Sequence, residues 1–306
     1  MGERERRLTA GRPVVRRRPS RRRVALRRIT ALAALAGGVA LLVWLGTIAF
    51  DGDDEPKAVA VAPAKPLRII FPEGFTRAQM AGRITAVDEI AKQKRHVTPR
   101  LSAREYLDAS ASSRLPGKFA GDGKRRPLEG FLFPATYEFT ATTRSKLLVA
   151  DQLTAFRRKW KEVDLRYARS KNLTQYDVLI IASMVEEEVI AASERPLVAA
   201  VIYNRLHNRM PLQIDATTRY GLHIPYGRPI TQEELDSSNP YNTRNRAGLP
   251  PTPITNPGMA SIQAAAHPAN VDYLFFVRKP DKIHHFFTTS LDEFNAYVRE
   301  HPVVGA

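Results

Sequence analysis

Three consecutive glutamates, Glu186, Glu187 and Glu188, close an apolar run in the stretch IASMVEEEVIAASER at residues 181–195. A carboxyl group among apolar side chains loses hydration of its charged form, which raises its pKa toward neutrality. A carboxyl with such a pKa can donate a proton and later take one back, as a general acid and base must. The types and positions of these residues therefore point to proton-transfer chemistry.

Helical periodicity distinguishes Glu188 from its two neighbours. Each residue of an α-helix advances by about 100°, so residues spaced at i, i+3, i+4 and i+7 share one face. This spacing is met by Ile181, Met184, Val185 and Glu188. We therefore expect Glu188 to face inward and the other two glutamates to face solvent or polar partners. Periodicity alone favours a structural ion pair of Glu188 with Arg195 or Arg205 over a catalytic role.

The helix that carries the three glutamates has a clear start. Thr174 and Asp177 have the spacing of a capping box, so we expect the helix to begin there and to run through Glu188. After it, Ser193 is expected to cap another helix with Pro196 in its first turn. Before it, an amphipathic helix is expected over residues 146–170, with a buried set of Leu147, Leu153, Phe156, Trp160 and Val163.

Short strands and further helices surround these elements. A strand at 67–71 precedes a helix that Thr76 is expected to cap, with Met80, Ile84 and Val87 on one side. Two prolines exclude a continuous helix over residues 125–139. In the C-terminal third, helices are expected to start at Thr231, Asn256 and Ser290, and strands are expected at 272–277 and 284–288.

The positive charge of the chain is concentrated at its N-terminus. The 306 residues carry a net charge of +16, and residues 1–28 alone hold 12 arginines and 2 glutamates. The next 22 residues, 29–50, are uncharged and long enough for a transmembrane helix. Acidic residues follow from Asp51, so the charge difference predicts a cytoplasmic N-terminus and a main body on the outer side of the membrane.

Two alternatives for the N-terminal region are less favoured. A cleaved signal peptide has a shorter apolar region and a recognisable cleavage site, which residues 29–50 do not show. An arginine tail that binds DNA is a second alternative, but next to a membrane span such a tail suits lipid headgroups or sets the topology. The chain has no cysteine, which excludes disulfides, thiol catalysis and cysteine metal sites.

The expected fold class is α+β, with a membrane anchor. We expect five parts: a basic cytoplasmic tail (1–28), a transmembrane helix (29–50), a linker (51–66), a small α+β module (67–120) and a mixed α+β domain (121–306).

Four long motifs show a family resemblance. They are LEGFLFPATYEF (128–139), IASMVEEEVIAASERPLVAAVIYNRLHNRMPLQIDATTRYGL (181–222), NPYNTRNRAGLPPTPITNPGMASIQAAAHPANVDYLFFV (239–277) and HHFFTTSLDEFN (284–295). Together they closely resemble the endolytic murein transglycosylases of the YceG-like family, over roughly residues 67–300. The resemblance implies a single N-terminal membrane span, a LysM-like module at 67–120 and a catalytic transglycosylase domain at 121–306.

The resemblance also implies a reaction and its catalytic residue. Members of this family are lyases that cut the β-1,4 bond between N-acetylmuramic acid (MurNAc) and N-acetylglucosamine (GlcNAc) within glycan strands. They leave a 1,6-anhydro-MurNAc end, and for this chain such cutting implies termination of nascent strands. Because the 6-hydroxyl of the sugar itself attacks, one carboxyl suffices where other glycosidases need two. The last acid of the family's catalytic motif corresponds to Glu188, the residue that periodicity also selects.

Further site residues are expected from the same motifs. The substrate-binding candidates are Asn204, Gln213, Asp215, Tyr241, Asn242 and Glu129. Tyr241 could stack on a sugar face, and Asp215 could act as a second acid, although structural roles are open for each of these residues. Neither a cofactor nor a metal is expected; His284 and His285 are adjacent on a predicted strand, so their side chains point to opposite faces.

The expected partners follow from the same reading. They are peptidoglycan glycan strands, the membrane through the N-terminal helix, and peptidoglycan synthases, with no nucleic acid. A non-catalytic peptidoglycan-binding membrane protein is the alternative function. The chain departs from the usual family pattern at Glu187, Ile214, Ala216, Arg244 and Thr252.

Overall fold

The computed structural model describes residues 66–111, 113–119 and 123–302. They belong to one of two compact units of the chain, Pro63–Ala306. The predicted basic tail and transmembrane helix, and the linker up to residue 65, lie outside the described residues. Within the ranges that are described, no helix has both the length and the apolar character needed to cross a membrane.

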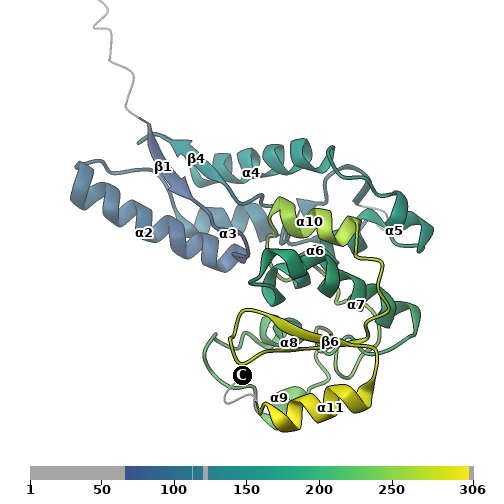
Figure 1. Ribbon diagram of the computed structural model, residues 1–306. Helices are drawn as coiled ribbons and strands as arrows, with labels where there is room; N and C mark the ends of the chain where they lie inside the picture. The colour runs from purple at the N-terminus through teal and green to yellow at the C-terminus, as the bar shows by residue number, and fades with distance from the viewer. Residues whose placement is uncertain (1–65, 112, 120–122, 303–306) are drawn as a thin grey trace, which may run out of the picture. The chain divides into compact units, whose positions relative to one another are not determined.

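The described part is a mixed α+β fold, which confirms that part of the predicted fold class (Figure 1). Its strands are β1 (Leu67–Ile70), β2 (Ser113–Arg114), β3 (Arg125–Arg126), β4 (Thr136–Phe139), β5 (Phe275–Arg278) and β6 (His285–Thr288). Its helices are α2 (Arg77–Arg95), α3 (Ala103–Ala111), α4 (Ser145–Trp160), α5 (Arg166–Ser170), α6 (Gln175–Glu188), α7 (Arg195–His207), α8 (Asp215–Leu222), α9 (Gln232–Leu235), α10 (Met259–Ala266) and α11 (Leu291–Glu300). The strands pair as three antiparallel two-stranded sheets, β1 with β4, β2 with β3 and β5 with β6.

The first hydrophobic core lies between the β1–β4 sheet and helices α2, α3 and α4. Strand β1 pairs with β4 so that Leu67 is opposite Phe139, and Ile69 is fully buried. Thr76 caps α2 in a capping box with Gln79, as predicted. The core takes residues from both sides of position 120, because Phe71 and Phe131 both belong to it. The domain boundary at residue 120 stays a prediction.

The helix predicted over 146–170 is two helices rather than one, because α4 ends at Trp160 and α5 begins at Arg166. Phe156 is buried in the first core, whereas Leu165 is buried in the second, so the chain has to turn between them. The predicted buried set also needs one correction. Leu147 is 51% exposed, and its neighbour Leu148 is buried instead.

The second hydrophobic core surrounds α6. Thr174 caps this helix in a capping box with Asp177, and the helix runs through Glu188, as predicted. Every residue from Val178 to Val185 is buried, so the helix is enclosed on all sides rather than on one face. Helices α7 and α10 pack against it, and Figure 1 shows α10 alongside α6. After Val185 the side chains of the three glutamates are partly exposed.

Two predicted helix starts are wrong, those at Ser193 and Asn256. Helix α7 begins after a 3₁₀ turn, Ala192–Glu194, with Glu194 rather than Ser193 at its N-cap; Pro196 does lie in its first turn. Helix α10 begins after Gly258. The side chain of Asn256 accepts hydrogen bonds from the backbone N–H groups of Gly130 and Leu132 instead.

The C-terminal segment forms a hairpin and a helix, as predicted. In the β5–β6 hairpin Arg278 is opposite His285. Strand β5 starts three residues later than predicted, because the side chain of Asn204 in α7 binds the backbone carbonyls of Val271 and Tyr273. Ser290 caps α11 by accepting a hydrogen bond from the N–H of Glu293.

Candidate active site

The three glutamates at the end of α6 lie in three different environments. The Glu186 carboxyl accepts a hydrogen bond of 2.9 Å from the N–H of Gly258, at the start of α10. It also lies 3.8 Å from the guanidinium of Arg195, and its side chain is only 7% exposed. Glu186 therefore holds the end of α6 against α10 and α7.

Glu187 is bound from the other side. The hydroxyl of Tyr226, in the segment between α8 and α9, donates a hydrogen bond to its carboxylate. The pKa of Glu187 is raised to about 6, chiefly by burial; the Tyr226 hydrogen bond lowers it and the charge of Glu186 raises it. Glu186 and Glu187 thus both have polar partners, as predicted, but Glu188 is not more buried than they are, because all three glutamates are partly buried.

Glu188 is the last residue of α6 and is partly exposed. Burial raises its pKa to about 7; the charges of Asp215 and Glu187 act in the same direction, and Arg278 acts against them. In the part of the chain that the structure describes, no group donates a hydrogen bond to its carboxylate. Its carboxyl group has a raised pKa, and neither of its oxygen atoms accepts a hydrogen bond from a described residue. Proton transfer to a bound substrate requires both properties.

Arg278 of β5 positions the backbone at Glu188. Its guanidinium donates a hydrogen bond of 2.9 Å to the backbone carbonyl of Glu188, which is unsatisfied by the helix because α6 ends there. The structural alternative from periodicity, an ion pair of Glu188 with Arg195 or Arg205, is not found among the described contacts. Arg195 lies against Glu186, and Arg205 donates to the carbonyls of Leu274, Pro211 and Leu212.

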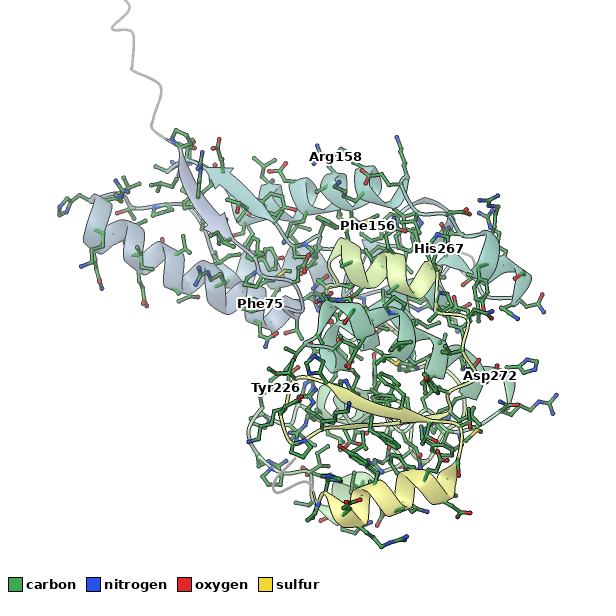
Figure 2. The ribbon with its side chains drawn as sticks, in the orientation of Figure 1. Phe75, Phe156, Arg158, Tyr226, His267 and Asp272 are labelled. Atoms are coloured by element: carbon green, nitrogen blue, oxygen red, sulfur yellow. The ribbon has the colours of Figure 1, made fainter. Side chains whose placement is uncertain are left out.

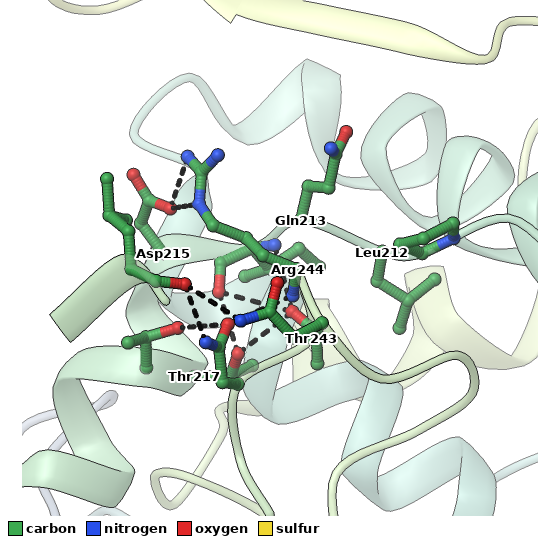
Figure 3. Close-up of polar contacts among 12 residues, drawn as sticks. Leu212, Gln213, Asp215, Thr217, Thr243 and Arg244 are labelled. Carbon is green, nitrogen blue, oxygen red and sulfur yellow. Dashed lines mark hydrogen bonds and ion pairs between the residues drawn. The ribbon is translucent and has the colours of Figure 1, made fainter. Parts of the chain in front are cut away.

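Asp215 lies at the start of α8 and forms an ion pair with Arg244 (Figure 3). The Nε and a terminal nitrogen of Arg244 lie 2.8 Å and 2.7 Å from the same carboxylate oxygen. The segment before Asp215 is held by Thr243, whose hydroxyl accepts from the N–H of Ile214 at 3.0 Å. Because the charge of Asp215 raises the pKa of Glu188, the two carboxyls share one electrostatic environment.

Most of the remaining candidates are engaged within the protein. The amide of Asn204 binds two carbonyls before β5, and Gln213 is exposed and accepts a hydrogen bond from Arg205. The Tyr241 hydroxyl is bonded to Thr252 at 2.8 Å. The amide of buried Asn242 donates to the carbonyls of Leu235 and Ser237. The assignment of these residues to substrate binding stays a prediction.

Glu129 is buried and fully hydrogen-bonded. Its carboxylate accepts from the N–H of Arg77 at 2.9 Å, the amide of Asn256 at 2.7 Å and the hydroxyl of Tyr220 at 3.2 Å. Burial raises its pKa to about 8, although these donors lower it. The group connects the start of α2, the segment before α10 and helix α8. Its part in substrate binding stays a prediction as well.

The loop after β1 lies close to Glu186 and Glu187. The N–H of Gly74 donates to the carbonyl of Asn256 at 3.0 Å. A Cβ atom added to Gly258 would lie 2.0 Å from the carboxyl of Glu73, so a larger residue at this position would require the Glu73 side chain to move. Burial, and then the charge of Glu186, raise the pKa of Glu73. The end of α6 is therefore packed against the N-terminal core as well as against α10.

Sequence reasoning missed two residues around Glu188, namely Arg278 and Tyr226. Both come from segments far along the chain, so their contacts leave no signal in local spacing. The two adjacent histidines do alternate as predicted: His284 is exposed, whereas His285 is buried with its Nδ1 at 2.7 Å from Glu194. Across the described ranges, no group of three or more His, Asp or Glu side chains could hold a metal ion.

Comparisons with known proteins show which family this sequence resembles. The sequence profile of the YceG-like family matches residues 46–300. The endolytic murein transglycosylase of Bacillus subtilis (strain 168) is 32% identical over 243 residues, which cover 78% of this chain and 66% of that protein. The protein of the same name from Streptococcus pneumoniae (strain ATCC BAA-255 / R6) is 30% identical over 267 residues, which cover 82% of this chain and 46% of that protein.

A solved structure is similar as well. The crystal structure of the "yceG-like" protein lmo1499 from Listeria monocytogenes superimposes with a TM-score of 0.61 at 28% identity, covering 78% of this chain and 76% of that one. The chain therefore shares its fold over most of that length, while it spans less than two thirds of either curated relative.

Proposed function

The chain belongs to the YceG-like family, and we propose that it is an endolytic lytic transglycosylase that cuts peptidoglycan glycan strands. The proposal is supported by the relatives, which are named endolytic murein transglycosylases. The observation that carries it is the environment of Glu188, a partly exposed carboxyl with a pKa of about 7 and no protein donor among the described residues.

In the proposed reaction Glu188 acts twice. Its protonated carboxyl gives a proton to the glycosidic oxygen, and the bond between that oxygen and C1 of MurNAc breaks. The 6-hydroxyl oxygen of the same MurNAc then forms a bond to C1, and its proton passes to the Glu188 carboxylate. The products are a 1,6-anhydro-MurNAc end and a GlcNAc 4-hydroxyl, and Glu188 is protonated again. No water is consumed, because the attacking hydroxyl belongs to the substrate.

Asp215 supports the same reaction through its charge. Cleavage of a glycosidic bond passes through a state in which C1 and the ring oxygen carry positive charge. A carboxylate that shares the environment of Glu188 stabilises this charge. The Arg244 ion pair holds the Asp215 carboxylate in place.

The proposal is tested by the products of the full-length chain on purified peptidoglycan. Mass spectrometry of the digested material should show 1,6-anhydro-muropeptides with the wild type and almost none with Glu188→Gln. Glu138→Gln is a matched control, because this glutamate pairs with Arg68 on an exposed strand. Undiminished products from Glu188→Gln would overturn the assignment.

The same assay separates the competing activities. Reducing ends that carry oxygen from labelled water would identify a hydrolase instead. Binding of glycan with no cleavage by the wild type would identify a non-catalytic wall-binding protein.

The finer features belong to the same proposal. We infer a cytoplasmic N-terminus, a membrane helix at 29–50, a LysM-like module at 67–120 that binds glycan, and cleavage that terminates nascent strands beside peptidoglycan synthases. A reporter phosphatase that is active only outside the cytoplasm should be active when fused after Ala306. Activity of a cytoplasmic reporter at the same position would contradict this topology.

A further inference from the structure

A tight turn between α8 and α9 brings an exposed aromatic residue to the end of α6. The N–H of Arg228 donates to the carbonyl of Pro225 at 3.4 Å, so Tyr226 and Gly227 are the central residues of the turn. Gly227 has a φ of 85°, which a glycine adopts without strain at the third position of a type II turn. Tyr226 therefore lies at the tip of a defined backbone structure.

The turn is held from both of its ends. The guanidinium of Arg219 donates to the carbonyl of Pro225 at 3.3 Å and to that of Arg228 at 2.7 Å. Just before the turn, Ile224 is buried. Just after it, Arg228 pairs with Glu234 of α9. These contacts restrain the backbone on either side of Tyr226.

The ring of Tyr226 is exposed but not free. Its side chain, labelled in Figure 2, is 64% exposed, and its hydroxyl donates to the carboxylate of Glu187. Glu187 directly precedes Glu188, and the charge of Glu188 also acts on Tyr226. An exposed ring fixed in this way, beside a candidate catalytic carboxyl, loses little conformational entropy when a ligand covers it.

The neighbouring tyrosines do not offer such a ring. The rings of Tyr220 and Tyr241 lie 5.2 Å apart, packed on each other. Their hydroxyls are bonded to Glu129 and Thr252. The stacking role that the sequence suggested for Tyr241 therefore fits Tyr226 better. A pyranose ring presents a face of C–H groups, for which an aromatic face is a suitable partner.

We propose that Tyr226 is a substrate-binding residue whose ring stacks on a sugar of the glycan strand next to the bond that Glu188 cuts, and that Glu187 is a positioning residue that fixes this ring. This inference rests on the proposed function for the identity of the ligand. It assigns to Glu187 a role distinct from that of Glu188: Glu187 accepts a hydrogen bond from the Tyr226 hydroxyl and exchanges no proton with the substrate.

Binding without turnover tests the stacking contact. The full-length Glu188→Gln protein is titrated with peptide-free glycan strands, prepared by removing the stem peptides with an amidase, and the affinity is measured by calorimetry. Adding Tyr226→Ala should weaken binding roughly three- to tenfold, the loss expected for one aromatic contact. Tyr226→Phe keeps the ring and should weaken binding less than Tyr226→Ala does. Unchanged affinity in the Tyr226→Ala protein overturns the inference.

A matched control separates stacking from general damage. Tyr167 of α5 is also an exposed tyrosine, but it lies before the start of α6, and a helix of that length spans about 21 Å. Tyr167→Ala should leave glycan affinity unchanged. If it weakens binding as much as Tyr226→Ala does, the inference is overturned. Thermal melting of each variant confirms that it is folded before the affinities are compared.

The positioning role of Glu187 has its own readout. Glu187→Gln retains an oxygen that accepts the Tyr226 hydrogen bond, so it should bind glycan almost as the parent does. Glu187→Ala removes the acceptor and should weaken binding, but only while Tyr226 is a tyrosine. An equal loss in the Tyr226→Phe background overturns the role of Glu187.

Kinetics distinguish failure of this inference from failure of the proposed function. In the otherwise wild-type chain, Tyr226→Ala should raise KM for glycan cleavage with a smaller change in kcat. Cleavage with an unchanged KM overturns the inference and leaves the transglycosylase intact. If the wild type forms no anhydro product, the proposed function is overturned. If Tyr226→Ala then still weakens glycan binding, the inference about the stacking contact is supported.

Discussion

Glu188 and Glu129 are two carboxyl groups whose pKa values are both raised by burial, to about 7 and about 8. Their hydrogen bonds differ. Glu129 accepts from Arg77, Asn256 and Tyr220, which come from three segments of the chain. The Glu188 carboxylate has no donor among the described residues and is partly exposed.

This difference shows that a raised pKa does not by itself identify a catalytic acid. A buried carboxyl that is surrounded by donors contributes to stability, because each donor would otherwise be unsatisfied. A carboxyl whose pKa is raised in the same way, but whose oxygen atoms accept no hydrogen bond from the protein, can exchange a proton with a ligand. We therefore expect replacement of Glu188 to affect the reaction and replacement of Glu129 to affect the fold.

The largest expected effect is on the rate of glycan cleavage. Glu188→Gln should lower kcat by about 10²–10⁴-fold, the contribution of a general acid, while the protein stays folded. The measurement is the initial rate of anhydro-product formation, with circular dichroism as the check on the fold. Loss of the native spectrum in this variant would contradict the assignment of Glu188 to chemistry alone.

The next effect is on stability. Glu129→Ala removes the acceptor of one buried and two partly buried hydrogen bonds and should lower the free energy of unfolding by about 3–5 kcal/mol. Glu129→Gln keeps one acceptor oxygen and should lose less. Chemical denaturation at pH 7 measures both variants. A raised KM with unchanged stability would instead show that Glu129 contacts the substrate.

A smaller effect is the pH dependence of stability that Glu188 contributes. The folded-state pKa of Glu188 is above its ordinary value of 4.5, so its ionised form destabilises the fold. This destabilisation develops as the pH rises from about 4.5 through about 7 and is complete at higher pH. Glu188→Gln should therefore be more stable than wild type by about 1–3 kcal/mol at pH 8 and nearly equal to it at pH 4.5.

Thermal unfolding of the wild type and Glu188→Gln at the two pH values provides this comparison. The informative result is a difference in sign: Glu188→Gln should be more stable than the wild type at pH 8, whereas Glu129→Ala should be less stable. A Glu188→Gln protein that is less stable than wild type at pH 8 would place Glu188 in the same class as Glu129.

The smallest effect concerns the charges around Glu188. The reaction needs the protonated carboxyl, so kcat/KM should fall as the pH rises through the pKa of Glu188, about 7. Asp215→Asn removes a charge that raises this pKa and should move the decline to lower pH. Arg278→Gln removes a charge that lowers it and should move the decline to higher pH. Each shift should be at most about one pH unit, or 1.4 kcal/mol.

Arg278→Lys is the control for this prediction, because it keeps the charge. It should leave the pH of the decline almost unchanged, even if the loss of the guanidinium hydrogen bond lowers the rate. Shifts of Asp215→Asn and Arg278→Gln in the same direction would contradict the electrostatic account.

Local features of the fold were predictable because their partners are close in sequence. The predicted N-caps at Thr76, Thr174 and Thr231 are all confirmed, and each forms a capping box with the residue three positions later. The β5 and β6 strands were also found from local pattern. The break between α4 and α5 was not predictable, because it results from Phe156 and Leu165 entering two different cores.

The candidate site divides in the same way. Periodicity predicted that Glu188 shares a face with apolar residues, and in the structure burial raises its pKa to about 7, in the direction expected. Periodicity could not show that α6 is buried on all sides, nor that Asn256 contacts Gly130 rather than starting a helix. Tyr226 contacts Glu187 from 39 residues away, and such a contact follows only from the tertiary arrangement.

The hydrogen bond from Arg278 to the carbonyl of Glu188 joins residues 90 positions apart, so during synthesis it can form only after Arg278 has been added to the chain. A ribosome adds about 5–20 residues per second, so Glu188 is made roughly 5–20 s before Arg278. During that interval α6 can pack in its core, but its last carbonyl lacks the guanidinium that holds it. The cutting site thus reaches its final form only after the β5–β6 hairpin has been translated, and an interrupted chain that lacks the hairpin does not carry it.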